Sequence, residues 1–104
     1  LAALMRLPPG TLRSQALRRM GVNRVSFCFE LFNRERFVEV CPGKHRQYGL
    51  DRYLEAVEYC AKEVPATGRG FEPWVTNGEI IVGLEPPADS IAAIDWITGV
   101  GAIP

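Results

Sequence analysis

The chain has 104 residues, 47% of them hydrophobic and 23% charged, which suits one folded domain at most and excludes a disordered tail. Its 12 basic residues balance its 12 acidic residues, so there is no positive surplus to attract nucleic acid or an anionic membrane. No apolar run approaches the ~20 residues that span a bilayer, and we therefore expect neither a nucleic-acid nor a membrane partner.

The cysteine and histidine content limits the metal chemistry that we expect. Cys28, Cys41 and Cys60 are odd in number and lie in apolar stretches, which indicates reduced thiols and a cytoplasmic location. The spacings between these cysteines fit no local zinc or iron–sulfur motif, and His45 is the single histidine. We therefore predict no metal ligand in this chain.

The beginning of the chain predicts two strands with a helix between them. The apolar run at 2–5, which precedes a Pro-Pro-Gly turn, is typical of the end of a buried strand. Helical spacing of apolar residues then predicts a helix that has Thr11 as its N-cap and ends at Gly21. Residues 25–31 are dense in β-branched and aromatic side chains, and they predict a strand covered on both faces.

A short helix is predicted next, over residues 34–41, with Asn33 as its N-cap. Proline and glycine at positions 42 and 43 predict its end. We expect the following loop to contact a substrate or partner rather than to carry a Cys–His nucleophile. The side chains that this helix is expected to bury are Phe37, Val38 and Cys41.

The strongest helical pattern covers residues 50–64. Asp51 lies in its first turn, where a negative charge suits the helix dipole, and Pro65 predicts its end. The apolar residues that repeat at helical spacing are Leu50, Tyr53, Leu54, Val57, Ala61 and Val64.

Two short apolar segments, 74–76 and 80–82, follow a predicted loop over 66–70 and indicate strand structure, the second buried on both faces. Asn77-Gly78 lies between them, and this dipeptide is a frequent hairpin turn. The region therefore forms either an antiparallel pair or part of a parallel sheet.

The last predicted helix follows Pro86-Pro87 and is capped by Asp89 or Ser90. Gly99 and Gly101 predict its end, and residues 102–103 read as the start of another element. The side chains that this helix is expected to bury are Ile91, Ile94 and Ile97.

Strands and helices therefore alternate, which predicts βαβ units and a parallel sheet of the α/β class. In such folds, ligands bind at the carboxyl ends of the strands. Glu30 at one strand end either accepts hydrogen bonds from ribose hydroxyls or an amine, or pairs with an arginine at the rim. The candidate arginines are Arg24, Arg34 and Arg36. At the next strand end, Gly83 either lets a ligand or a neighbouring backbone approach closely or starts a turn. Glu85 either has a functional role or is an exposed acid.

Two pairs of segments resemble a known family. Residues 25–31 followed by 37–44, and residues 53–59 followed by 80–86, are similar in order and spacing to the middle and late part of a radical S-adenosylmethionine barrel related to biotin synthase. The resemblance covers about residue 12 to residue 104. It implies a part of a (β/α) TIM-like barrel, with about three βα units and parallel strands.

This resemblance implies a cofactor and an activity. S-adenosylmethionine would bind beside a [4Fe–4S] cluster, and its reductive cleavage would give a 5′-deoxyadenosyl radical that abstracts hydrogen from a small-molecule substrate. Glu30 matches the acidic position that contacts the ribose and methionine portions, whereas Cys28 stands where the family has an asparagine.

The resemblance further implies that Ile81, Val82 and Gly83 belong to the strand that lies against the adenine. The family pattern for this strand is GxIxGxxE. Here Glu79 replaces its first glycine and Pro86 replaces its final glutamate.

The CxxxCxxC motif that holds the cluster in the family is absent from this sequence. Either residues 1–104 are a fragment of a radical S-adenosylmethionine core barrel, which the missing initial methionine favours, or the likeness is to the scaffold alone. As a fragment, the chain would be inactive by itself, and the cluster ligands and the remainder of the barrel would lie outside it. Two other interpretations remain: a fragment of an aldolase-like or phosphate-binding barrel, and a stand-alone α/β binding module.

Overall fold

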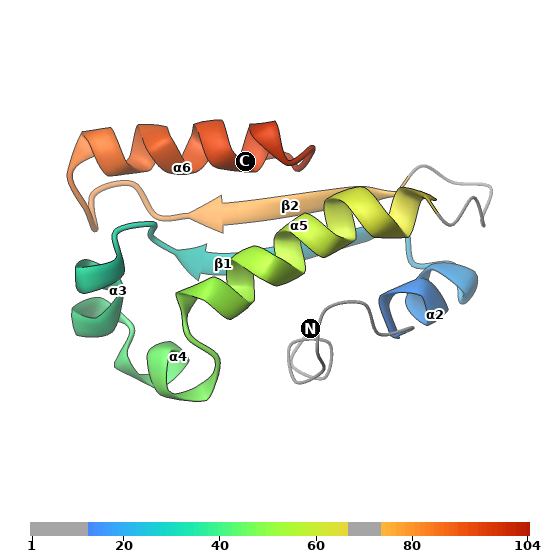
Figure 1. The fold of residues 1–104 in the computed structure, drawn as a ribbon, viewed down its shortest axis with the longest axis horizontal. Helices are drawn as coiled ribbons and strands as arrows, with labels where there is room; N and C mark the ends of the chain where they lie inside the picture. Colours follow the sequence, from blue (N-terminus) through green and yellow to red (C-terminus); the bar gives the residue numbers. More distant parts are fainter. Residues whose placement is uncertain (1–12, 67–73) are drawn as a thin grey trace.

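The computed structural model describes residues 13–66 and 74–104 and forms an α/β unit in which helices pack on a small parallel sheet (Figure 1). The expectations for residues 2–5, for the cap at Thr11 and for most of the loop over 66–70 lie outside the described residues. The elements in chain order are α2 (Arg13–Arg19), β1 (Arg24–Glu30), α3 (Arg34–Val40), α4 (Pro42–Gln47), α5 (Leu50–Ala66), β2 (Val75–Ile80) and α6 (Pro87–Gly99).

The sheet consists of β1 and β2, which pair in parallel and in register from Arg24 with Val75 to Cys28 with Glu79. Both strands point toward the end of the molecule where α3 and α4 lie (Figure 1). Asn77 and Gly78 lie within β2, so no hairpin forms there. The predicted parallel α/β class is therefore confirmed.

The chain end adds a third strand position beside β2. Ile103 forms an isolated parallel bridge with Asn77. Its amide donates to the Thr76 carbonyl at 2.9 Å, and its carbonyl accepts from the Gly78 amide at 3.0 Å. This contact is a single bridge and not a strand, and it gives β2 a hydrogen-bonded neighbour on each edge.

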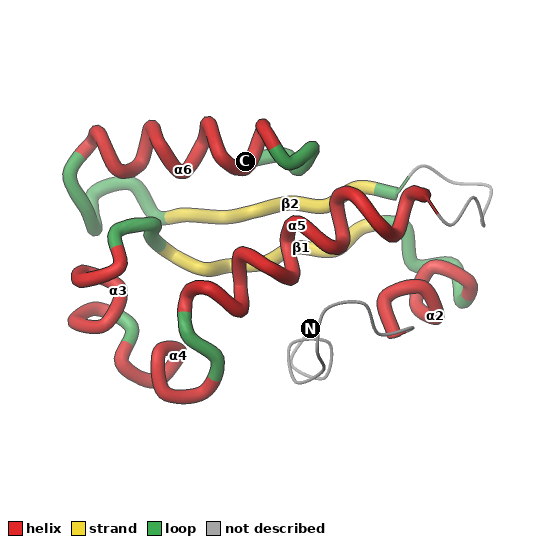
Figure 2. The backbone as a smooth tube through the Cα atoms, viewed as in Figure 1, coloured by secondary structure: helices red, strands yellow, loops and turns green. Residues whose placement is uncertain are grey.

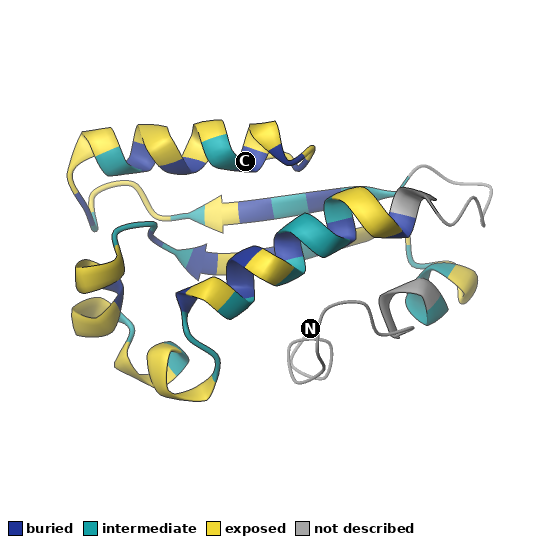
Figure 3. Ribbon diagram, viewed as in Figure 1, coloured by how far each residue is buried: buried dark blue, intermediate teal, exposed yellow. Residues whose placement is uncertain are grey.

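One face of the sheet is buried and the other is open, in contrast to the prediction of two covered faces. Val25, Phe27 and Phe29 alternate along β1 and are at most 5% exposed. Figure 3 shows a similar alternation along β2. The buried Thr76 and Gly78 pair with Val25 and Phe27, so they share the covered face. Ser26 and Cys28 alternate with these residues and lie on the open face, where Ser26 is partly buried and Cys28 is exposed. The apolar composition of the strand therefore does not show that both of its faces are covered.

The core lies between the sheet and two long helices (Figure 2). In α5, the buried side chains follow the predicted repeat, except that Cys60 is buried and Ala61 is only partly buried. The helix runs one residue beyond Pro65, where its end was predicted. In α6, Ile97 is fully buried as predicted, together with Ala93, but Ile91 is 60% and Ile94 is 40% exposed, so the prediction was wrong for these two residues. No side chain caps α6, which begins after Pro86.

The predictions for the short helices are partly confirmed. Asn33 caps α3 as predicted, since its side chain accepts from the Arg36 amide, and Phe37 is buried. Val38 is 44% exposed, contrary to expectation. Pro42 does not begin a loop but stands in the first turn of α4, where proline is well tolerated.

None of the helices in the described part of the chain is long and apolar enough to cross a membrane.

The close approach of α6 to β2 depends on Gly78. A Cβ atom at this position would lie 3.1 Å from Cγ1 of Ile97 and 3.2 Å from Cε1 of Phe29. We predict that Gly78→Val lowers the free energy of unfolding by about 1–3 kcal/mol, because the added methyl groups overpack the core. Urea denaturation measures this change.

Gly99→Ala is the matched control, because no atom lies within 4 Å of the position that its Cβ would take. This substitution should leave the midpoint of urea denaturation unchanged or raise it slightly. Equal midpoints for the two variants would contradict the tight packing at Gly78.

Candidate functional site

Glu30 ends β1 in an unusual backbone conformation. Its φ is 72°, and it is the single non-glycine residue with a positive φ among the residues that the structure describes. The Leu31 amide donates to the Phe29 carbonyl at 2.8 Å, and the Ile81 amide donates to the Glu30 carbonyl at 2.8 Å. The strand register also shifts between Cys28 and Glu30. A tight turn held from both sides therefore aims this carboxylate at the strand end, and such strain often accompanies a binding site.

Lys44 of α4 is the ion-pair partner of Glu30. Its Nζ lies 2.9 Å from Oε1 of Glu30 and also donates to the Cys28 carbonyl at 2.6 Å. The ammonium group lies 5.5 Å from the centre of the Tyr53 ring. Burial disfavours the charged form of Lys44, but the hydrogen bond and charge of Glu30 outweigh it and raise the lysine pKa. The predicted pairing at the rim thus exists, with a lysine in place of an arginine.

A second carboxylate, that of Glu79, lies on the open face of the sheet. The Ser26 hydroxyl donates to its Oε1, and the Cys28 thiol donates to its Oε2 with 3.2 Å between sulfur and oxygen. These two hydrogen bonds lower the pKa of Glu79. Burial, followed by the hydrogen bond and charge of Glu79, raises the pKa of Cys28, so this thiol is held in its protonated form.

The segment after β2 differs from the predicted buried strand. β2 ends at Ile80, and the side chains of Ile81 and Val82 are 52% and 80% exposed. Gly83 has φ 107°, and no atom lies within 4 Å of a Cβ built on it. The glycine is therefore required by the turn and not by a neighbouring backbone. Ile81 and Val82 form an exposed apolar ledge at the carboxyl end of the sheet.

Glu85 is buried, not an exposed acid. It is 6% exposed, and its carboxylate accepts hydrogen bonds from the amides of Phe32, at 2.8 and 3.0 Å, and Asn33, at 2.9 Å. The negative charge thereby satisfies amide groups at the start of α3. The residue joins the two loops that follow the strands.

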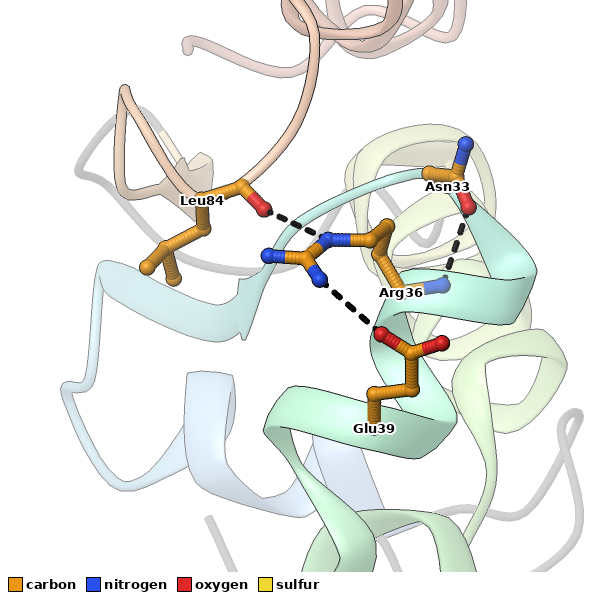
Figure 4. A network of polar contacts seen from close by, with 4 residues as sticks. All are labelled: Asn33, Arg36, Glu39 and Leu84. Carbon is orange, nitrogen blue, oxygen red and sulfur yellow. Dashed lines mark hydrogen bonds and ion pairs between the residues drawn. The ribbon is translucent and has the colours of Figure 1, made fainter.

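Further polar contacts secure the same junction. Figure 4 shows the Arg36 side chain between the Leu84 carbonyl, 3.3 Å from Nε, and the Glu39 carboxylate, 2.9 Å from Nη1. The Asn33 side chain also donates to Asp89 of α6 at 3.1 Å. The loop after β2 is consequently attached to α3 at several points.

The predicted site residues are only partly brought together. Glu30 and Cys28 share the Lys44 ammonium, and the main chain of Ile81 is bonded to Glu30, whereas Val82 and Gly83 lie farther along the exposed turn. Sequence analysis missed the role of Lys44. Pro42 could have indicated the helix that carries Lys44, because proline is common in the first turn of a helix, but it does not indicate the contact with Glu30.

No group of three or more His, Cys, Asp or Glu side chains that could hold a metal ion occurs within residues 13–66 and 74–104.

Comparisons with known proteins give one curated relative and no family model. The chain is 38% identical over 66 residues to a bacteriochlorophyllide c C-7(1)-hydroxylase from Chlorobaculum limnaeum. The match covers 64% of this chain and 15% of the hydroxylase, so it concerns a small part of that protein. No family model matches the chain, and no solved structure matches it significantly.

The backbone of Glu30 gives a direct test of strain. We predict that Glu30→Gly is more stable than Glu30→Ala by about 1 kcal/mol, because both variants lose the carboxylate but only glycine adopts a positive φ without cost. Thermal or urea unfolding of the two variants measures the difference.

Glu79 supplies the control pair, since it lies in β2 with no positive φ. There the order should reverse, with alanine more stable than glycine. If alanine is also the more stable residue at position 30, the turn is not strained.

The buried carboxylate of Glu85 gives a second test. We predict that Glu85→Ala lowers the free energy of unfolding by about 3 kcal/mol, because the amides of Phe32 and Asn33 lose a charged acceptor. The control is Glu55→Ala, which removes the exposed carboxylate of a 3.6 Å ion pair with Arg52 and should cost less than about 1 kcal/mol. Similar losses in both variants would refute the structural role of Glu85.

Proposed function

We propose that the carboxyl end of this sheet binds S-adenosylmethionine in a radical S-adenosylmethionine enzyme. In this proposal, residues 1–104 are part of its (β/α) core barrel, and the substrate is a small molecule. The observation that carries the proposal is the Glu30 carboxylate, which a strained turn holds at the strand end beside an exposed apolar ledge.

The described side chains fit the chemistry of this cofactor. Oε1 of Glu30 is bonded to Lys44, and because a carboxylate has about four lone-pair sites, the group can also accept from a ribose hydroxyl or an ammonium group. Ile81 and Val82 offer apolar surface to a purine. No atom lies within 4 Å of the position that a Cβ of Gly83 would take, so this side of the turn is open. Cys28 lies close to Glu30 and contributes its carbonyl and thiol to the same edge.

The arrangement of the strands supports the barrel. β1 and β2 are parallel, their covered face is packed against α5 and α6, and Ile103 begins a third parallel position. In a (β/α) barrel, helices cover the outer face of the strands and the other face lines the interior. The open face with Ser26, Cys28 and Glu79 is consistent with such an interior.

The similarity to a hydroxylase supports the chemistry. Hydroxylation at a carbon requires that a carbon–hydrogen bond is broken. When bound, the cofactor and a [4Fe–4S] cluster supply a 5′-deoxyadenosyl radical that removes such a hydrogen. The cluster ligands are assigned to residues outside this chain, because the sequence holds no CxxxCxxC motif.

The carboxylate of Glu30 gives the decisive test. In the natural protein that carries these residues, purified without oxygen, we predict that Glu30→Gln weakens S-adenosylmethionine binding about tenfold, since a charged acceptor becomes neutral. Isothermal titration with S-adenosylmethionine measures the dissociation constant.

Glu55→Gln on the surface of α5 is the control and should bind as the unaltered protein does. Equal affinity of the Glu30→Gln variant and the control would reject the proposed site. A protein that binds no S-adenosylmethionine at all would reject the function.

A further inference from the structure

We propose that Lys44 is a positioning residue that holds the Glu30 carboxylate in its ligand-binding orientation. This inference rests on the proposed function of Glu30. It concerns a residue of α4, a helix that sequence analysis did not foresee.

The contacts of Lys44 converge on one point of the strand end. Its Nζ is bonded both to the side chain of Glu30, at 2.9 Å, and to the main-chain carbonyl of Cys28, at 2.6 Å. The first bond fixes the carboxylate, and the second fixes the peptide just before the register shift. One ammonium group therefore holds both the side chain of Glu30 and the main chain just before it.

The surroundings of Lys44 fix the ammonium in turn. It faces the ring of Tyr53 at 5.5 Å, and the side chains of the Lys44–Glu30 pair are only 35% and 20% exposed. Partial burial strengthens an ion pair relative to one in open water. The raised pKa of Lys44 means that the lysine remains charged at neutral pH.

The other ion pairs show what is special here. Lys62 and Glu58 also form a close pair, with 2.7 Å between Nζ and Oε1, but they lie one turn apart on α5 and are about half exposed. Lys44 instead joins α4 to the end of β1, 14 residues earlier in the chain. Loss of the Lys44 side chain therefore leaves the carboxylate of Glu30 without this cation.

A double-mutant cycle tests whether Lys44 acts through Glu30. The measured quantity is the dissociation constant of S-adenosylmethionine for the natural protein, by isothermal titration. We expect Lys44→Met to weaken binding about tenfold in the unaltered background, but less than about twofold in the Glu30→Gln background. Lys44→Arg, which keeps a cation, should recover part of the affinity.

Lys62→Met is the matched control and should leave the affinity unchanged. If Lys44→Met costs the same factor in both backgrounds, the lysine acts independently of Glu30 and the inference fails. If Glu30→Gln weakens binding and Lys44→Met does not, this inference fails while the proposed function stands. If Glu30→Gln has no effect, the proposed function itself fails.

Discussion

The arrangement of the site depends on the buried carboxylate of Glu85. A charge removed from water is costly unless it is fully hydrogen-bonded, so the loop after β2 is held where the amides of Phe32 and Asn33 can meet it. This contact fixes the start of α3, and α4 follows α3 directly. Because α4 carries Lys44, the position of this cation beside Glu30 is linked to Glu85, which lies 41 residues after Lys44 in the sequence.

The sequence predicts the elements better than it predicts their surroundings. The repeat in α5 and the aromatic run in β1 each indicate the correct element, since local periodicity reflects a covered face. Ile91 and Ile94 are expected in the core but are exposed, because an apolar side chain does not reveal which neighbour covers it. Pro42 indicates a stop, although the same residue type also starts helices.

The candidate site is predictable to a similar extent. The position of a carboxylate at the end of an apolar strand is enough to make Glu30 a candidate from the sequence. The sequence does not identify Lys44 as the partner of Glu30, because Lys44 reaches the carboxylate only through the orientation of α4. No local sequence pattern encodes that orientation. Likewise, nothing in the local sequence distinguishes a buried Glu85 from an exposed acid, since its amide donors come from a distant loop.

The hydrogen bond from the Ile81 amide to the Glu30 carbonyl joins the loop after β2 to the end of β1. The peptide that follows Glu30 is therefore held from outside its own turn, so the positive φ of this residue depends on the loop of the neighbouring strand as well. The two loops that follow the strands are thus joined directly at the strand end as well as through the carboxylate of Glu85.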